Sequence, residues 1–253
     1  MNKKKILTTT ICIAIWIFLW FIAAFFIDKK IFLPGPVDTL KAFCSLAVTK
    51  EFYQSVLISL SGILKGFLIG MGGGILFASL ACRFSFLESF FSVPIRVIKA
   101  VPVASFVILA LLWINSKNLS ILISSFMVLP VVYTGLLSAL KNTDRKMLDF
   151  AVVFKLSPLK KIRYVYIPSA IHPLTASCSV AMGFAWKSGI AAEIIGLIKN
   201  SIGNELYKAK LYLETPKLFA WTAAIVLISF LCEKLITLIL TCIGKALGGI
   251  YNE

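Results

Sequence analysis

Residues 6–27 read ILTTTICIAIWIFLWFIAAFFI, an uncharged run that is long enough to cross a lipid bilayer as one helix. The rest of the chain is similar, because 59% of its 253 residues are hydrophobic and only 15% are charged. An ordinary soluble protein has roughly 45–50% apolar and about 25% charged residues. This composition excludes both a soluble enzyme and a disordered chain. The sequence therefore predicts an all-α, polytopic membrane protein.

Six stretches are long enough to span the bilayer. They lie at about Ile6–Ile27, Val56–Cys82, a third run that ends near Ile114, Leu119–Leu140, Ala170–Leu197 and Leu218–Ile243. The third is unusual, because residues 84–100 carry three charges and because prolines lie at positions 94 and 102. We expect an interfacial amphipathic segment there that leads into a short or kinked span. The six spans are predicted to form a single transmembrane domain over residues 1–253.

The chain is strongly basic, with 26 Lys and Arg against 11 Asp and Glu. In a membrane protein such an excess indicates cytoplasmic loops and anionic lipid headgroups rather than nucleic acid. With the N-terminus inside, the cytoplasmic segments carry 14 basic residues and the external segments carry 9. The sequence therefore predicts that both termini are cytoplasmic.

No catalytic or metal site is predicted. The six cysteines form no C-x-x-C pair, and most lie inside apolar runs, where they behave as small hydrophobic residues. His172 is the single histidine, so a multi-histidine metal site is excluded, and it lacks the partners of a catalytic triad. An intramembrane enzyme is correspondingly disfavoured.

The longest cytoplasmic connection, residues 141–168, reads KNTDRKMLDFAVVFKLSPLKKIRYVYIP and predicts two short helices with a corner between them. The first is expected to begin after Asn142 or Thr143 as N-cap, with Asp144 in its first turn. Its apolar residues fall at helical spacing on one face, namely Met147, Phe150, Ala151 and Phe154.

The second helix is expected to start at Ser157-Pro158, since Ser as N-cap and Pro at the first helical position are a strong start signal. It should stop at Pro168, and Ser169 could then cap the fifth span. Two interpretations remain open for this loop. It could lie as a basic helix on anionic lipid, or its small apolar face with a basic rim could dock into a groove of a cytoplasmic partner.

The chain resembles the permeases of ABC importers, in particular the nitrate/sulfonate/taurine-type branch. In the loop, Leu148-Asp149-Phe150-Ala151, Leu156-Ser157 and Ile167-Pro168 resemble the family pattern E-A-A…G…I-x-L-P. Three further motifs agree in order and spacing: Leu33-Pro34-Gly35-Pro36, Val101-Pro102-Val103-Ala104, and Trp186 to Glu193 followed by Gly196.

The resemblance implies a type I-like permease fold in which this loop is the coupling helix that contacts a separate ATPase subunit. The implied ATPase-coupling residues are Asp149, Phe150, Ala151, Lys155, Leu156, Ser157, Pro158, Ile167 and Pro168. Asp149 stands at the family's Glu and Phe150 at its first Ala. Lys155 replaces the family's Gly, which normally permits a sharp turn, and Ser157-Pro158 could supply the corner instead.

The resemblance also implies the partners and the cargo. The chain holds no G-x-x-x-x-G-K-[ST] loop, so no cofactor is expected on it, and ATP and Mg would be bound by the ATPase partner. The other expected partners are an extracytoplasmic substrate-binding protein, a second permease copy, most simply in a homodimer, and the lipid of a bacterial inner membrane. The branch handles nitrate, sulfonates, taurine and thiamine precursors, so the solute stays open.

Four glycines of the second span, at positions 62, 66, 70 and 74, are each four residues apart. Such a row of small residues lets two helices approach closely. Helix packing is the favoured interpretation, and a gating hinge is the alternative.

Charges inside spans are expensive and indicate function. Lys187 and Glu193 of the fifth span are therefore candidates for the substrate pathway, together with the adjacent Trp186. In this pathway Lys187 would attract an anion. The alternative for Lys187 and Glu193 is structural ion pairing. An ion- or proton-coupled secondary transporter remains the second functional hypothesis, with Glu193 and Glu233 as the coupling acids.

Overall fold

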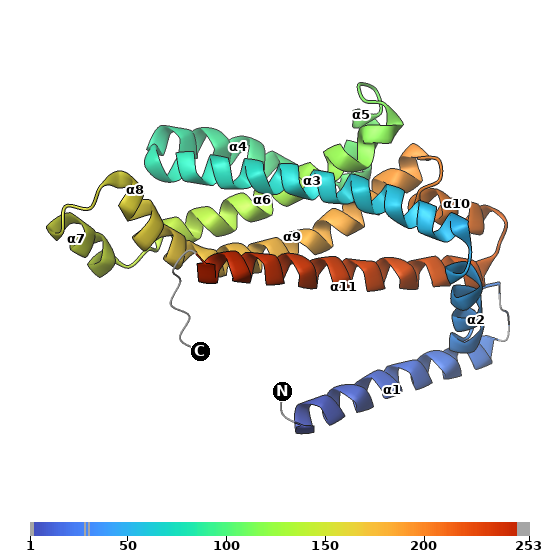
Figure 1. Ribbon diagram of the computed structural model, residues 1–253. Coiled ribbons are helices and arrows are strands. Elements are labelled where there is room, and N and C mark those ends of the chain that lie inside the picture. The colour runs from blue at the N-terminus through green and yellow to red at the C-terminus, as the bar shows by residue number, and fades with distance from the viewer. Residues whose placement is uncertain (1–2, 28, 30, 247–253) are drawn as a thin grey trace. The chain divides into compact units, whose positions relative to one another are not determined.

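The computed structural model describes residues 3–27, 29 and 31–246, and every regular element within them is a helix (Figure 1). The α-helices are α1 (Lys3–Ile27), α2 (Pro36–Ala47), α3 (Lys50–Arg83), α4 (Ser85–Ala100), α5 (Val103–Ala110), α6 (Leu119–Lys141), α7 (Arg145–Val153), α8 (Pro158–Lys161), α9 (Ile167–Gly196), α10 (Ile202–Leu211) and α11 (Thr215–Ala246). A 3-10 turn, η1 (Ser116–Asn118), precedes α6, and a π-helical turn, η2 (Ile162–Tyr166), joins α8 to α9. The predicted all-α membrane fold is confirmed. The extreme ends of the chain, which we predict to be cytoplasmic, lie outside the described residues.

The chain forms two compact units. One comprises residues 1–58 and 199–227, and the other comprises residues 59–198 and 228–253. Both α3 and α11 therefore contribute to each unit. The prediction of a single domain over residues 1–253 stays a prediction.

The first unit is built around aromatic side chains near the loop after α1. Trp20 of α1 stacks on Phe219, with ring centroids 5.9 Å apart, and its indole N–H donates to the carbonyl oxygen of Pro34 at 3.1 Å. Gly35 precedes α2 and Pro36 opens it, where a missing N–H removes no helical hydrogen bond. The Leu-Pro-Gly-Pro motif thus both starts α2 and supplies the acceptor that orients Trp20.

In the second unit, α3 lies directly against α6 through the row of four glycines. A Cβ atom at Gly66 would lie 2.5 Å from the carbonyl oxygen of Ile121, and one at Gly70 would lie 2.5 Å from that of Ser125. Carbon and oxygen atoms do not approach so closely without a shift of the backbone, so a side chain at either position would push the helices apart. Gly62 faces Ser120 of α6, and Gly74 faces Val132 of α6.

Helices α6 and α9 pack antiparallel along their length. The hydroxyl of Ser124 in α6 donates to the carbonyl oxygen of Ala185 in α9 at 3.0 Å. Gly189 of α9 faces both Ser124 and Ile63, so α3, α6 and α9 meet at this point. These three helices form the core of the second unit.

The predicted third span is a bent pair of helices. The axes of α4 and α5 form an angle of 103° at a break that contains Pro102. The segment expected to be interfacial is α4, and it packs along α3, with the rings of Phe91 and Phe77 stacked at 4.6 Å. Ile95 of α4 is buried in a cluster with residues of α3, α6 and α9. Packing against these helices therefore explains the apolar face of α4.

Among the described residues, four helices are long and apolar enough to cross a membrane: Leu7–Ile27, Lys50–Arg83, Ser116–Lys141 and Thr215–Ala246. The bent pair α4–α5 can add a fifth. The predicted fifth span, α9, has 30 residues and a length of about 45 Å, but it does not meet the same criterion of apolarity. It buries 12 of its residues against neighbouring helices, and a helix in such a position tolerates polar residues that lipid would not.

The glycine row generates a stability prediction. Gly66→Ala should destabilise the protein by about 1–3 kcal/mol, because its Cβ would overlap the backbone of α6. The matched control is Gly72→Ala on the same helix, where a Cβ would meet no heavy atom within 4 Å. That change should stabilise α3 by about 0.5–1 kcal/mol. Thermal unfolding of the detergent-solubilised chain measures both effects, and equal melting temperatures would contradict the close approach of α3 to α6.

Candidate functional site: the hook and the polar face of α9

The connection of residues 141–168, which we call the hook, begins with a capped helix. The Asp144 carboxylate accepts a hydrogen bond from the backbone N–H of Lys146 at 2.9 Å, so Asp144 is the N-cap of α7. The prediction of Asn142 or Thr143 as N-cap was wrong by one or two residues. Asn142 instead closes α6, and the Thr143 hydroxyl donates to the carbonyl oxygen of Leu140 at 2.9 Å. All three residue types cap helices well, so local chemistry alone does not choose between them.

Helix α7 ends in a tight turn at Lys155. The backbone N–H of Lys155 donates to Val152 O and that of Leu156 donates to Ala151 O, both at 3.0 Å. These two bonds define a Schellman motif, which requires a left-handed residue between them. Lys155 is that residue, with φ of 47°. The structure thus places Lys155 in a conformation that glycine adopts without a steric cost, at the position where the resemblance implies a Gly.

The second helix of the hook starts as predicted at Pro158, after Ser157 at the N-cap position, but it does not stop at Pro168. Instead, α8, η2 and α9 follow one another without a break from Pro158 to Gly196. Proline lacks the N–H of a helical hydrogen bond, and the wide π-helical turn before Ile167-Pro168 can accommodate it. The prediction of Ser169 as an N-cap was therefore wrong. The Ser169 hydroxyl instead lies 3.0 Å from that of Thr143 and ties the two ends of the hook together.

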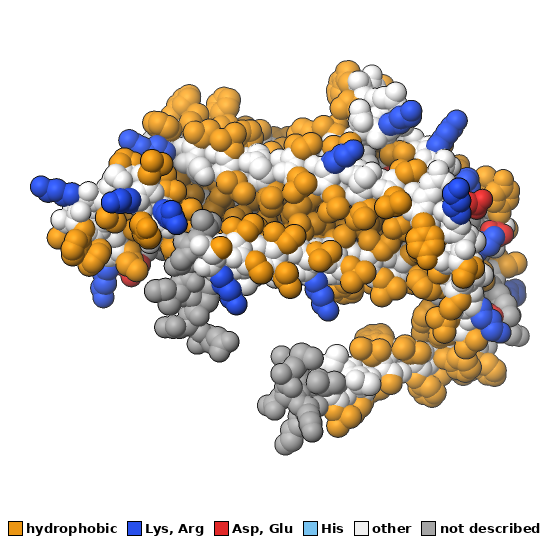
Figure 2. Space-filling view, viewed as in Figure 1, with side chains coloured by type: hydrophobic (Ala, Val, Ile, Leu, Met, Phe, Trp, Pro, Cys, Tyr) orange, Lys and Arg blue, Asp and Glu red, His pale blue; other side chains and the backbone are white. Residues whose placement is uncertain are grey.

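The outer face of α7 is aromatic and exposed. Phe150 and Phe154 are 57% and 60% exposed, and their ring centroids lie 4.2 Å apart. Ala151, predicted on the same face, is buried where α7 packs on η2. Figure 2 shows Lys and Arg side chains gathered over α7 and α8, among hydrophobic side chains. The hook therefore presents an exposed aromatic pair and the exposed carboxylate of Asp149, with basic side chains on both α7 and α8.

The three predicted pathway residues of α9 divide between two faces. Trp186 and Glu193 are seven residues apart, about 20° around the helix, and both are buried. Lys187 is exposed. The Glu193 carboxylate accepts a hydrogen bond from the Ser59 hydroxyl of α3 at 2.7 Å, a partner that sequence reasoning missed because the two residues are 134 positions apart.

A polar groove of about 940 Å³ lies between α9 and the C-terminal half of α11. Within it the Ser179 hydroxyl donates to the Glu233 carboxylate, and Lys234 lies beside them. Ala176 lines the same groove, and Lys187 lies about 20° from Ala176 around α9, three turns further along. Lys187 is about 80° from Ser179 around α9, so it lies at the edge of the helical face that lines the groove. Within the described part of the chain, no group of three His, Cys, Asp or Glu side chains could hold a metal ion.

Comparison with known proteins gives a consistent set of relatives. The family described as "Binding-protein-dependent transport system inner membrane component" matches residues 70–248. SsuC of Bacillus subtilis, named as an aliphatic sulfonates transport permease, is 25% identical over 93% of this chain and 84% of its own length. The taurine transport system permease protein TauC of Escherichia coli is 22% identical over 89% of this chain and 83% of its own length. The nitrate import permease protein NrtB of Synechococcus elongatus is 24% identical over 76% and 72% of the two chains.

A solved structure agrees with the fold. The crystal structure of an amino acid ABC transporter with histidines covers 80% of this chain with a TM-score of 0.57 and 18% identity, and 97% of that chain is matched. The predicted resemblance to importer permeases is confirmed. The alternative of an ion-coupled secondary transporter is wrong, because the relatives are permease components of ABC importers.

The left-handed Lys155 generates a prediction for the hook. Lys155→Gly should remove about 1 kcal/mol of backbone strain, because glycine adopts positive φ without a Cβ clash. The amide of Leu156, bonded to Ala151 O, should then exchange with deuterium about fivefold more slowly. The control is Lys160→Gly inside α8, which should speed local exchange because glycine weakens a helix. Faster exchange at Leu156 in the Lys155→Gly variant would contradict the assigned turn.

Proposed function

We propose that this chain, which belongs to the family of binding-protein-dependent transport system inner membrane components, pairs with a second identical copy to form the solute pathway of an ATP-driven importer. The chain is a membrane-spanning permease subunit, and permeases of this family lack an ATPase of their own. ATP and Mg are bound by two separate ATPase subunits in this proposal. An extracytoplasmic binding protein delivers the solute.

The observation that carries the proposal is the exposed aromatic pair of the hook. Phe150 lies on α7 and Phe154 caps its C-terminal end, and α7 extends beyond the ends of α6 and α9 in Figure 1. Paired aromatic side chains exposed on a short helix are typical anchors of protein interfaces, whereas single exposed hydrophobic residues carry no such signal. Asp149 and Lys155 at the rim supply charges of both signs, which suits a protein groove better than a uniformly anionic lipid surface. We therefore assign the exposed face of α7 to the ATPase rather than to lipid.

The hook is assigned to the cytoplasmic side. Its end of the second unit carries Arg83 and the seven basic residues of the segment 141–168, one of which, Lys141, pairs with Glu88 of α4. Basic residues near span ends favour the cytoplasm. With the hook inside, we infer that both termini are cytoplasmic, because an even number of proposed crossings separates the hook from each end.

The polar face of α9 is assigned to the solute pathway. A groove lined by Ser179, Glu233 and Lys234 is unusual in so apolar a chain, and charged residues inside spans face a pathway or a packed interior. Lys187 continues this face. Relatives are named for aliphatic sulfonates, taurine and nitrate, and these solutes all bear oxyanion groups. We infer a small oxyanion as the solute, with Lys187 attracting it.

The first experiment isolates the complex from membranes that contain two differently tagged permease copies and the ATPase. Capture of one tag should recover the other tag and the ATPase together. Replacing both Phe150 and Phe154 by Ser should weaken ATPase recovery at least about tenfold, as expected for buried aromatic anchors. Recovery of the second permease copy should persist.

The matched control is Val152→Ser, since Val152 is 68% exposed on α7 but lies about 200° from Phe150 around the helix. Its ATPase recovery should stay close to that of the unmodified chain. Equal loss in the Val152 variant, or no loss in the double Phe variant, would contradict docking through this face. Recovery of a single tag would contradict the homodimer.

The second experiment addresses Lys187. In proteoliposomes that contain the whole importer, Lys187→Gln should lower uptake of an oxyanion solute about tenfold, because a cation on the pathway is lost. Lys187→Arg should retain most uptake. Lys65→Gln removes an equally exposed cation from α3 and serves as the control. Taurine, an alkanesulfonate and nitrate are each tested with the cognate binding protein, and unchanged uptake in Lys187→Gln would remove Lys187 from the pathway.

A further inference from the structure

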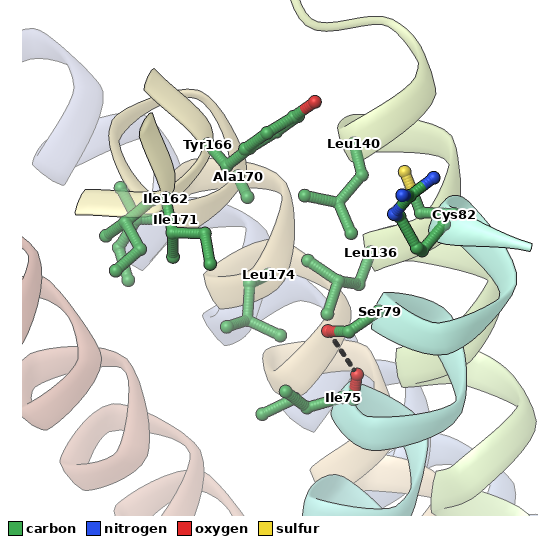
Figure 3. Close-up of a pocket in the computed structure, with 12 residues that line it drawn as sticks. Ile75, Ser79, Cys82, Leu136, Leu140, Ile162, Tyr166, Ala170, Ile171 and Leu174 are labelled. Carbon is green, nitrogen blue, oxygen red and sulfur yellow. Dashed lines mark hydrogen bonds between the residues drawn. The ribbon is translucent and has the colours of Figure 1, made fainter. Parts of the chain in front are cut away.

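A second cavity lies on the other side of α9, between α3, α6 and the η2–α9 segment (Figure 3). Its volume is about 450 Å³, and eight of its 12 lining residues are aliphatic. The hydroxyl of Ser79 is already used, because it donates to the carbonyl oxygen of Ile75 at 2.8 Å. The Ser79 hydroxyl hydrogen is therefore not available to a ligand, and aliphatic side chains form most of the cavity wall.

The cavity is polar at one end only. Figure 3 shows Cys82 and the Tyr166 hydroxyl at one end and Ile75 and Leu174 at the other. Arg83 is the single charged residue among those that line it. Lys161 adds a second cation, with its Nζ 5.8 Å from the ring centroid of Tyr166.

The nearby acid does not cancel these charges. Glu88 follows Arg83 by five residues and is paired with Lys141 of α6. The polar end thus keeps an excess of positive charge at the end of α3, where an anionic lipid headgroup would lie. Aromatic residues such as Tyr166 also favour this level of a membrane.

The size of the cavity selects among possible occupants. An α-helix about 10 Å wide fills on the order of 400 Å³ per turn, so the cavity would take only one turn of a neighbouring helix. One extended hydrocarbon chain suits an apolar space of this volume with cations at one end better. We propose that this cavity holds one acyl chain of an anionic phospholipid, with its phosphate against Arg83 and Lys161.

The site also contacts the hook. Ile162 and Tyr166 belong to η2, and they line the cavity together with Leu136 and Leu140 of α6. A bound chain therefore braces η2 against α6 and α3. This consequence rests on the proposed coupling function: lipid occupancy sets how tightly movement of the hook follows ATP hydrolysis.

Binding is tested with phosphatidylglycerol that carries a photoreactive group on one acyl chain, using the full importer in nanodiscs. Crosslinks should map to residues 75–83 and 167–174. The double change Arg83→Gln with Lys161→Gln should lower labelling by about tenfold or more, since each cation near a membrane surface contributes about fivefold. Lys65→Gln, an exposed cation elsewhere on α3, should leave labelling unchanged.

A second variant tests the cavity itself. Ser79→Phe places a ring in the cavity from an exposed position and should abolish labelling at residues 167–174, whereas Ile69→Phe on α3 lies outside the lining and should not. Equal labelling by phosphatidylcholine carrying the same group would overturn the anionic preference. Crosslinking of these residues to the second permease copy, rather than to lipid, would overturn the lipid assignment.

The functional consequence has its own readout, the number of solutes transported per ATP hydrolysed. In phosphatidylglycerol nanodiscs this ratio should exceed the phosphatidylcholine value at least about twofold, and Ser79→Phe should remove the dependence on lipid. Loss of labelling with no change in this ratio would overturn the bracing role. Failure of the hook variants to release the ATPase would instead contradict the proposed function and leave the labelling result standing.

Discussion

The second unit depends on the contact of backbone with backbone where α3 meets α6. Lipid is as apolar as the side chains themselves, so helices in a membrane gain little from hydrophobic burial and associate through close packing. The glycines at positions 62, 66, 70 and 74 remove the side chains that would prevent this contact. Gly189 extends it to α9, where a Cβ would lie 2.6 Å from Cγ1 of Ile63. Ser59 is one turn before Ile63 and Glu193 is one turn after Gly189, so the antiparallel approach brings hydroxyl and carboxylate within hydrogen-bonding distance.

The hook is also held firmly to this helical core. Its base is tied by the Thr143 and Ser169 hydroxyls, and α7 packs on η2, where Ala151 and Val165 are buried. Because α8, η2 and α9 are continuous, a force on α7 is carried into the core rather than absorbed by a flexible loop. The left-handed Lys155 stores a small strain at the corner, which the surrounding hydrogen bonds maintain. A stiff lever of this kind is what rigid-body coupling between a motor and a pore requires.

Much of this arrangement could be predicted from local sequence signals. Long apolar runs predict the spans, the four-residue spacing of glycines indicates a packing face, and Ser157-Pro158 predicts the start of α8. The failures have physical causes. Three good capping residues are adjacent at 142–144, so the choice depended on where α6 ends, and Pro168 is tolerated because a π-helical turn precedes it. The partner of Glu193 depends on tertiary packing that no local pattern encodes.

Helix α9 has two different sides, and this explains its mixed composition. Ala170, Ile171 and Leu174 face the apolar cavity beside α3 and α6, while Thr175 and Ser179 face the polar groove beside α11. A helix that served only as a lipid-facing span would not need both, and its hydropathy would be higher. Because the hook continues directly into α9, any displacement of the hook moves both surfaces together. Thus one helix can connect the proposed ATPase contact, the apolar cavity and the polar groove without a separate relay.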